Sequence, residues 1–102
     1  MKKHIKIYHE ALGIVPGEVI FSEISGYRAT DIHHIFAGGM GGGKRKEDRI
    51  ENLMALTRDE HLKYGDKKDT YLMLLIKHRN FLDNWGIKYD QKWFENKISK
   101  YE

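Results

Sequence analysis

The stretch Asp31-Ile32-His33-His34-Ile35 decides the fold, because it places two adjacent histidines on an apolar, β-prone run. Successive side chains of a strand point to opposite faces, so His33 and His34 are expected on opposite sides of it. One imidazole can then hold a metal ion while its neighbour performs acid–base chemistry close by. Downstream lie Asn52 and His61, so the polar residues follow the order His, Asn, His.

Length and composition limit the class of protein. The chain has 102 residues, enough for one domain with a modest core. Its composition, 40% hydrophobic and 32% charged, is typical of a globular protein rather than a disordered one. The net charge of +3 favours a polyanionic partner only weakly. The absence of cysteine excludes disulfides and thiolate metal sites, and the lack of a long apolar run predicts a cytoplasmic protein that does not enter the membrane.

The amino-terminal segment carries apolar residues at helical spacing. This spacing predicts a helix over residues 3–12, and Gly13 suits its carboxyl-terminal end. His4 and His9 lie five positions apart, which does not bring them onto one helical face. We therefore expect both of these histidines at the surface and not as a metal-binding pair.

Two short segments and a glycine-rich loop surround the histidine pair. Residues 19–21 and 28–35, with turn residues between them, predict a β-hairpin whose second strand carries both histidines. The loop over residues 38–46 is consistent either with a flexible connection or with a backbone that approaches a phosphodiester closely. In the second case, phosphates would be contacted by Lys44, Arg45 and Lys46.

A short helix is predicted to carry the last histidine of the motif. Thr57 and Glu60 form a Ser/Thr-x-x-Glu capping box, so the helix begins after Thr57 and His61 lies in its first two turns. Gly65 suits the end of this helix. Asp66 is then expected to cap the following helix rather than to bind a metal.

The carboxyl-terminal third is predicted to form two further helices. One covers residues 71–83 and includes the apolar run 72–76, which suggests burial by the core or by a partner. His78 in this helix is expected to be a polar-face or hydrogen-bonded core residue. The other helix covers residues 90–101, and its aromatic side chains are expected to pack in the core rather than to stack on bases.

Together these blocks resemble the HNH endonucleases, the ββα-metal or His-Me finger nucleases, and especially their small stand-alone bacterial and phage members. The resemblance covers about forty residues and rests on four separate blocks in the family's order and spacing. The blocks are Ser22-Glu23-Ile24-Ser25-Gly26, Asp31 to Ile35, Gly39-Met40-Gly41-Gly42, and Glu51-Asn52-Leu53-Met54-Ala55-Leu56-Thr57-Arg58-Asp59-Glu60-His61. It implies an α+β fold with a β-hairpin and short helix around a metal, flanked by an amino-terminal helix and carboxyl-terminal helices.

The resemblance also implies a role for each site residue. His33 and His61 would bind one divalent metal ion, and His34 would be the general base that takes a proton from the attacking water. Asn52 would hydrogen-bond across the loop and orient the strand that bears the base. Asp31 would lie beside the metal, either as a ligand or as a residue that steadies a histidine. The implied reaction is hydrolysis of a DNA phosphodiester that leaves 5′-phosphate and 3′-hydroxyl ends.

One departure from the family pattern concerns the structural zinc found in many members. Ser22 and Ser25 stand where one cysteine pair is expected, and Thr57 and Glu60 stand where the other is expected. Hydroxyl groups do not substitute for thiolates, so no structural zinc is expected. A chelator should therefore abolish cleavage without unfolding the protein, and a large fall in melting temperature would refute this.

A second departure concerns the remaining metal ligand. Some relatives place another histidine four residues after the first helical one, and here that position is Gly65. We therefore expect a site of two histidines, water and phosphate oxygens, with Asp31 nearby. Imidazole accepts Mn, Ni, Co or Zn as well as Mg, so the sequence leaves the metal open.

The resemblance implies a single nuclease domain over residues 1–102, with a core motif at about 19–65 and a helical extension at about 67–101. The implied partner is DNA, double-stranded in the simplest case, in a bacterial or phage-infected cell. The apolar run 72–76 could also serve a homodimer. Two alternatives stay open: a catalytically silent HNH-like module that binds nucleic acid, and an anion-binding adaptor that uses only the basic loop.

Overall fold

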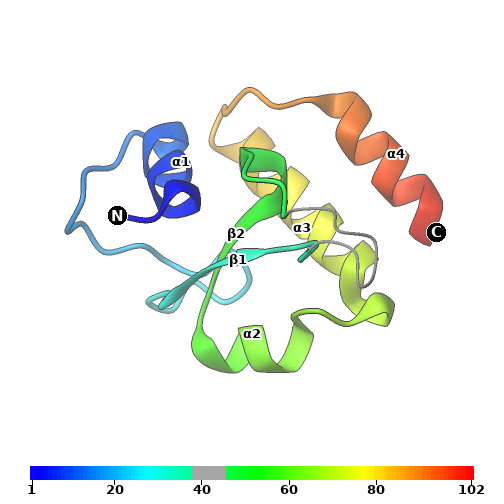
Figure 1. Ribbon diagram of the computed structural model, residues 1–102, viewed down its shortest axis with the longest axis horizontal. Coiled ribbons are helices and arrows are strands. Elements are labelled where there is room, and N and C mark those ends of the chain that lie inside the picture. Colours follow the sequence, from blue (N-terminus) through cyan, green and yellow to red (C-terminus); the bar gives the residue numbers. More distant parts are fainter. Residues whose placement is uncertain (38–45) are drawn as a thin grey trace.

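The computed structural model describes residues 1–37 and 46–102. They form an α+β fold with an amino-terminal helix, two antiparallel strands, a short helix and two carboxyl-terminal helices (Figure 1). In these two segments, no helix is long and apolar enough to cross a membrane. Residues 38–45, which include Lys44 and Arg45, lie outside the described part of the chain, so the interpretation of the glycine-rich loop stays a prediction.

Helix α1, Lys3–Leu12, has the bounds that the sequence predicts. It ends because Gly13 adopts a left-handed conformation, with φ of 70°, that a residue with a side chain rarely adopts. The expectation that both histidines of this helix lie at the surface is wrong for His9, which is 7% exposed. Burial is tolerated there because Nδ1 of the ring lies 2.8 Å from the carbonyl oxygen of Ile5, one turn earlier.

The sheet consists of β1, Asp31–His34, and β2, Leu53–Leu56. The strands run antiparallel, with Asp31 opposite Leu56 and His34 opposite Leu53. The predicted hairpin between residues 19–21 and 28–35 is confirmed only near its turn, because the part of the second strand that carries both histidines pairs with β2.

Before β1, Phe21 and Arg28 form an antiparallel bridge, flanked by backbone hydrogen bonds from Ser22 to Tyr27 and from Ala29 to Ile20. Residues 31–34 pair with β2 instead. The reason lies in burial, because every residue of β2 is buried whereas Val19 and Phe21 are exposed. The segment 53–56 therefore offers β1 a far larger apolar area to bury.

The sheet lies between two helical layers, with α1 on one side and α3, Tyr71–Asn84, on the other (Figure 1). Helix α4, Gln91–Tyr101, packs against α3. Two apolar clusters follow from this arrangement, because alternate strand residues face opposite layers. The cluster on the α1 side is built on Tyr8, Leu53 and Ala55. The larger cluster is built on Ile35, Met54, Leu56, Leu74, Leu75, Leu82, Trp93, Phe94 and Ile98.

Helix α2, Arg58–Tyr64, begins at the predicted capping box. Thr57 Oγ1 accepts from the backbone N–H of Glu60, and the Glu60 carboxylate accepts from the backbone N–H of Thr57. The prediction that Asp66 caps the next helix is wrong. A 3₁₀ turn, η2 at Lys68–Thr70, separates Asp66 from α3, so its side chain is free for another role.

The carboxyl-terminal helices confirm two predictions about burial. Trp93 and Phe94 are buried, so they pack in the core. His78 is fully buried and hydrogen-bonded at both ring nitrogens. Within the run 72–76, Leu74 and Leu75 belong to the core, so the run serves mainly this chain's own packing. A homodimer through it stays a prediction.

Candidate metal centre

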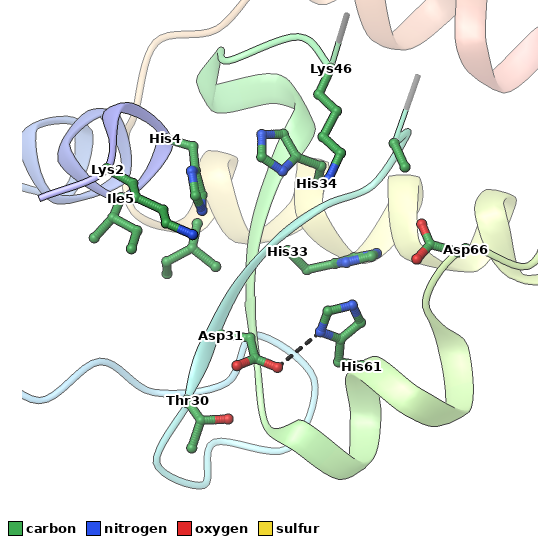
Figure 2. Close-up of a pocket in the computed structure, with 12 residues that line it drawn as sticks. Lys2, His4, Ile5, Thr30, Asp31, His33, His34, Lys46, His61 and Asp66 are labelled. Carbon is green, nitrogen blue, oxygen red and sulfur yellow. Dashed lines mark hydrogen bonds and ion pairs between the residues drawn. The ribbon is translucent and has the colours of Figure 1, made fainter. Parts of the chain in front are cut away.

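The pleat of β1 sends its two histidines to opposite faces of the sheet. His33 is 4% exposed and extends toward α2, whereas His34 lies on the α1 side of the strand (Figure 2). Both line one open cavity of about 430 Å³, which also contains Asp31, His61 and Asp66. The strand thus separates two histidine environments that share one solvent-accessible space.

The first environment is formed by His33, His61 and Asp66. Each offers one ligand atom, and these atoms all lie within 4.8 Å of one another. The two imidazole rings have centroids 4.4 Å apart, and Asp66 approaches them from the turn after α2 (Figure 2). The structure therefore brings the predicted histidines together and adds a carboxylate that the sequence interpretation assigned elsewhere.

His33 Nε2 is the feature of this group that most needs a partner. It is buried and has no hydrogen-bond partner among residues 1–37 and 46–102. Burial and, after it, the neighbouring His61 lower the pKa of His33 to about 4, so the ring is neutral at pH 7. A buried nitrogen without a partner is costly unless something else binds it, and a metal ion fits this donor set.

Asp31 orients His61 rather than joining the group directly. Its Oδ2 lies 2.9 Å from His61 Nδ1, which fixes Nδ1 as the donor and leaves Nε2 as the free ligand atom (Figure 2). Arg58 holds the same carboxylate from the other side, at 3.0 and 3.1 Å. Burial alone would raise the pKa of Asp31, but the hydrogen bonds from His61 and Arg58 hold it below its usual value. Asp31 therefore stays charged.

The turn after α2 explains how a carboxylate reaches the site. A Cβ at Gly65 would lie 2.5 Å from the His61 carbonyl oxygen and 2.7 Å from its ring, so no larger residue fits there. Asp66 follows with φ of 56°, a left-handed conformation that aspartate tolerates better than most residues. This turn carries the Asp66 carboxylate back toward His33. A strained backbone at such a position is typical of a functional site.

The second environment surrounds His34. Its Nε2 lies 2.7 Å from Asp48 Oδ1, and its ring is 4.7 Å from that of His4 in the first turn of α1. The hydrogen bond from His34 holds the pKa of the Asp48 carboxyl below its usual value. Burial lowers the pKa of His4, and the adjacent His34 lowers it further. No pattern in the sequence indicated that His4 or Asp48 would meet the histidine pair.

Asn52 is fully buried beside the loop that separates β1 from η1, Ile50–Asn52. Its side chain accepts from the backbone N–H of Phe36 at 2.9 Å. The same side chain donates to the carbonyl oxygens of Phe36 and Glu47, at 3.1 and 3.0 Å. Asn52 thereby joins the two ends of the loop and holds the end of β1 against β2.

The four residues that the resemblance places at cysteine positions, Ser22, Ser25, Thr57 and Glu60, also lie together. Ser22 donates to the Glu60 carboxylate at 2.5 Å, and the backbone N–H of Thr57 donates to the same oxygen at 2.8 Å. Burial opposes ionisation of Glu60, but hydrogen bonds from Ser22, Ser25 and Thr57 hold its pKa below the usual value. Hydrogen bonds therefore connect the loop before β1 to the start of α2.

Among the predicted basic residues, Lys46 is exposed and lines the cavity. Lys2 contributes a second ammonium group from the start of the chain. Phosphates that flank a bound phosphodiester could be contacted by these side chains.

Comparison of the chain with protein-family models, curated proteins and solved structures gives no match. The function must therefore be argued from the geometry. Asp66 is the residue whose role the sequence interpretation missed. The signal for it was its position directly after a glycine helix stop, where a left-handed aspartate can turn back toward the helix.

Proposed function

We propose that the chain is a metal-dependent DNA endonuclease of the HNH, or ββα-metal, type. It would hydrolyse phosphodiester bonds and leave 5′-phosphate and 3′-hydroxyl ends. The observation that carries the proposal is the meeting of His33, His61 and Asp66 around a buried imidazole nitrogen with no described partner. The four sequence blocks that resemble the HNH family support it independently.

His33, His61 and Asp66 would hold one divalent ion. Two neutral imidazoles and a carboxylate suit Mn, Ni, Co and Zn, and they also accept Mg. When bound, the ion supplies positive charge against the charge that develops on the phosphate and the leaving oxygen. The Asp66 carboxylate would repel a phosphodiester in the absence of a cation, so binding of substrate and metal should be linked.

His34 is the proposed general base. Donation of Nε2–H to Asp48 leaves Nδ1 with a free lone pair, which can take a proton from the attacking water. Asp48 fixes this tautomer and orients the ring. Asn52 keeps the loop closed, so the strand that bears His34 holds its direction. Lys46 and Lys2 would hold flanking phosphates, without reading the base sequence.

Nicking of supercoiled plasmid tests the proposal, with Mg²⁺, Mn²⁺ and Ni²⁺ supplied separately. The wild type should nick the plasmid with at least one ion. His34→Ala should lower the rate by about 10²- to 10⁴-fold, the range for loss of a general base. Resealing of the nicks by a DNA ligase checks the ends, because ligation needs a 5′-phosphate and a 3′-hydroxyl. Gel shift and circular dichroism of the variant separate lost chemistry from lost binding or folding.

A different result favours the alternative function. If wild type and His34→Ala leave the plasmid intact with every ion but both shift DNA, the chain is an HNH-like module that binds nucleic acid without cutting it. If DNA binding also survives loss of His33 and His61, the basic loop alone accounts for binding.

A further inference from the structure

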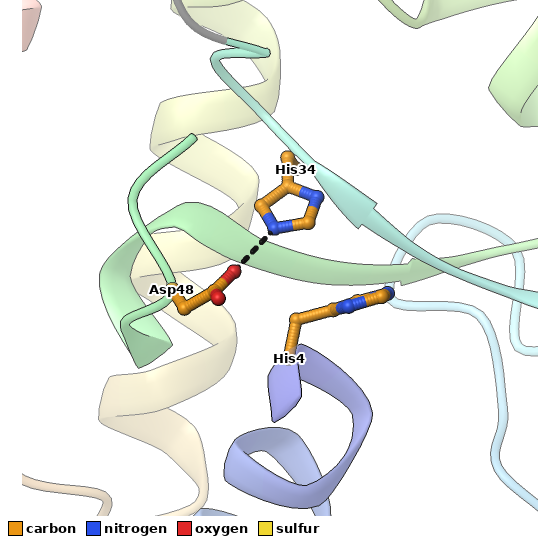
Figure 3. A group of neighbouring side chains, drawn as sticks. All are labelled: His4, His34 and Asp48. Carbon is orange, nitrogen blue, oxygen red and sulfur yellow. Dashed lines mark hydrogen bonds and ion pairs between the residues drawn. The ribbon is translucent and has the colours of Figure 1, made fainter. Parts of the chain in front are cut away.

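A second group of ligand atoms lies on the opposite face of β1 from the proposed metal centre. His4, His34 and Asp48 each offer one ligand atom, and these atoms lie within 4.8 Å of one another (Figure 3). The three residues come from α1, β1 and the segment before η1. All three are partly exposed, so an ion from solvent can reach them.

We propose that His4, His34 and Asp48 form a second, inhibitory metal site that is selective for transition metals. The inhibitory part rests on the function proposed above, because it requires His34 to act as the base. An ion that takes the lone pair of His34 competes with proton transfer to that ring. His34, oriented by Asp48, would thus serve catalysis at low metal concentration and be blocked by the bound ion at high concentration.

The donor set determines which ions bind. Two imidazoles and one carboxylate are typical ligands for Zn²⁺ and Ni²⁺, whereas Mg²⁺ prefers an oxygen environment and keeps its waters. His34 Nε2 and Asp48 Oδ1 are only 2.7 Å apart, so they separate slightly to admit an ion between them. The ring proton then moves from Nε2 to Nδ1, so a ring with an ion on Nε2 has no lone pair left to take a proton from water.

The charges around the two groups of ligand atoms determine which group binds an ion first. The first group has Asp66 as a ligand and Asp31 directly behind His61, so two carboxylates favour a cation there. The second group has one carboxylate, and Lys2 and Lys46 line the cavity nearby. The second site should therefore bind more weakly, and only ions with strong affinity for imidazole should fill it.

Isothermal titration calorimetry with Ni²⁺ tests the site without reference to activity. The wild type should bind two ions per chain, one more tightly than the other. His4→Phe keeps a ring beside His34 but carries no ligand atom, and it should lose only the weaker event. His61→Ala should lose the tighter event. A wild type that binds one ion, or a His4→Phe variant that binds as many ions as the wild type, overturns the second site.

Plasmid nicking over a range of Ni²⁺ concentrations tests inhibition. The wild-type rate should rise and then fall, whereas the His4→Phe rate should rise to a plateau at the same low-metal activity. If both proteins respond alike to Ni²⁺, the inhibitory role is overturned. If the wild type fails to nick the plasmid with every ion supplied while calorimetry shows two sites, the proposed nuclease function fails and the second metal site stands. Circular dichroism confirms that His4→Phe is folded.

Discussion

Two of the histidine–carboxylate groups among the described residues differ in whether every ring nitrogen has a partner. In the core, His78 Nδ1 lies 2.6 Å from Glu23 and Nε2 lies 2.6 Å from the carbonyl oxygen of Ile50. At the proposed metal centre, His33 Nε2 is equally buried but has no partner among the described residues. Because buried polar atoms are nearly always paired, the His78 and Glu23 group is structural and the proposed metal centre is suited to a ligand.

The core pair also shows what complete pairing requires. Both ring nitrogens of His78 face oxygen atoms, so each has a hydrogen-bond partner. Glu23 contacts the ring through one carboxylate oxygen, and its other oxygen accepts from Tyr8 at 2.7 Å and from the Ala55 backbone at 3.3 Å. This network ties α1, β2 and α3 together and leaves no position open for a ligand.

Loss of the core histidine, His78, should lower stability more than loss of a residue at the proposed metal centre. His78→Ala leaves the buried Glu23 carboxylate without the ring that it contacts at 2.6 Å, which should lower the free energy of unfolding by about 3–5 kcal/mol. Urea denaturation measures this change. The matched control is Lys77→Ala on the exposed side of the same helix, which should change stability little. A loss below about 1 kcal/mol, the size of one ordinary hydrogen bond, would contradict a structural role for this pair.

Loss of Asp31 should instead affect the site and spare the fold. Asp31→Asn weakens the hydrogen bond that fixes the His61 tautomer, and it should lower the nicking rate by about 10–100-fold. Arg58→Ala removes the other partner of the same carboxylate but leaves His61 in place, so its rate should stay close to that of the wild type. Equal losses in the two variants would show that Asp31 acts through its overall charge and not through His61.

A third carboxylate, Glu51, lies outside the proposed site and should make the stability of the fold depend on pH. Burial would raise its pKa, but hydrogen bonds from Arg49 at 2.9 Å and from the Asp90 backbone at 2.7 Å hold it below 4.5. The charged form therefore stabilises the fold above pH 4.5, and this contribution is lost as the pH falls through the lowered pKa. The melting temperature of Glu51→Gln should be lower than that of wild type near neutral pH and should converge with it in acid. A constant difference would contradict this assignment.

The elements that could be predicted from sequence were those with local signals. The bounds of α1 followed from apolar spacing and Gly13, and the start of α2 followed from the Thr57 and Glu60 pair. Strand pairing could not be predicted in the same way. The partner of β1 is fixed by which segment is buried, and that depends on helices distant in sequence.

The same reason limits what could be predicted of the site. His33, His34 and His61 were identifiable because the family-like spacing is written in the sequence. Asp66 required the left-handed turn after Gly65, and His4 required the packing of α1 beside the sheet. The His4 contact leaves no local pattern, and the glycine stop before Asp66 does not show where its carboxylate points, so only the folded chain brings these groups together.

We propose above that phosphodiester hydrolysis depends on an ion held by His33, His61 and Asp66. The most direct test compares metal-dependent plasmid nicking by wild type, His61→Ala and Leu62→Ala. Leu62 is the next residue of α2 and is 69% exposed, so its variant controls for changes to that helix. We predict nicking by wild type and Leu62→Ala, and a loss in folded His61→Ala that exceeds the about 10–100-fold expected for Asp31→Asn. Equal nicking by all three proteins would contradict the account.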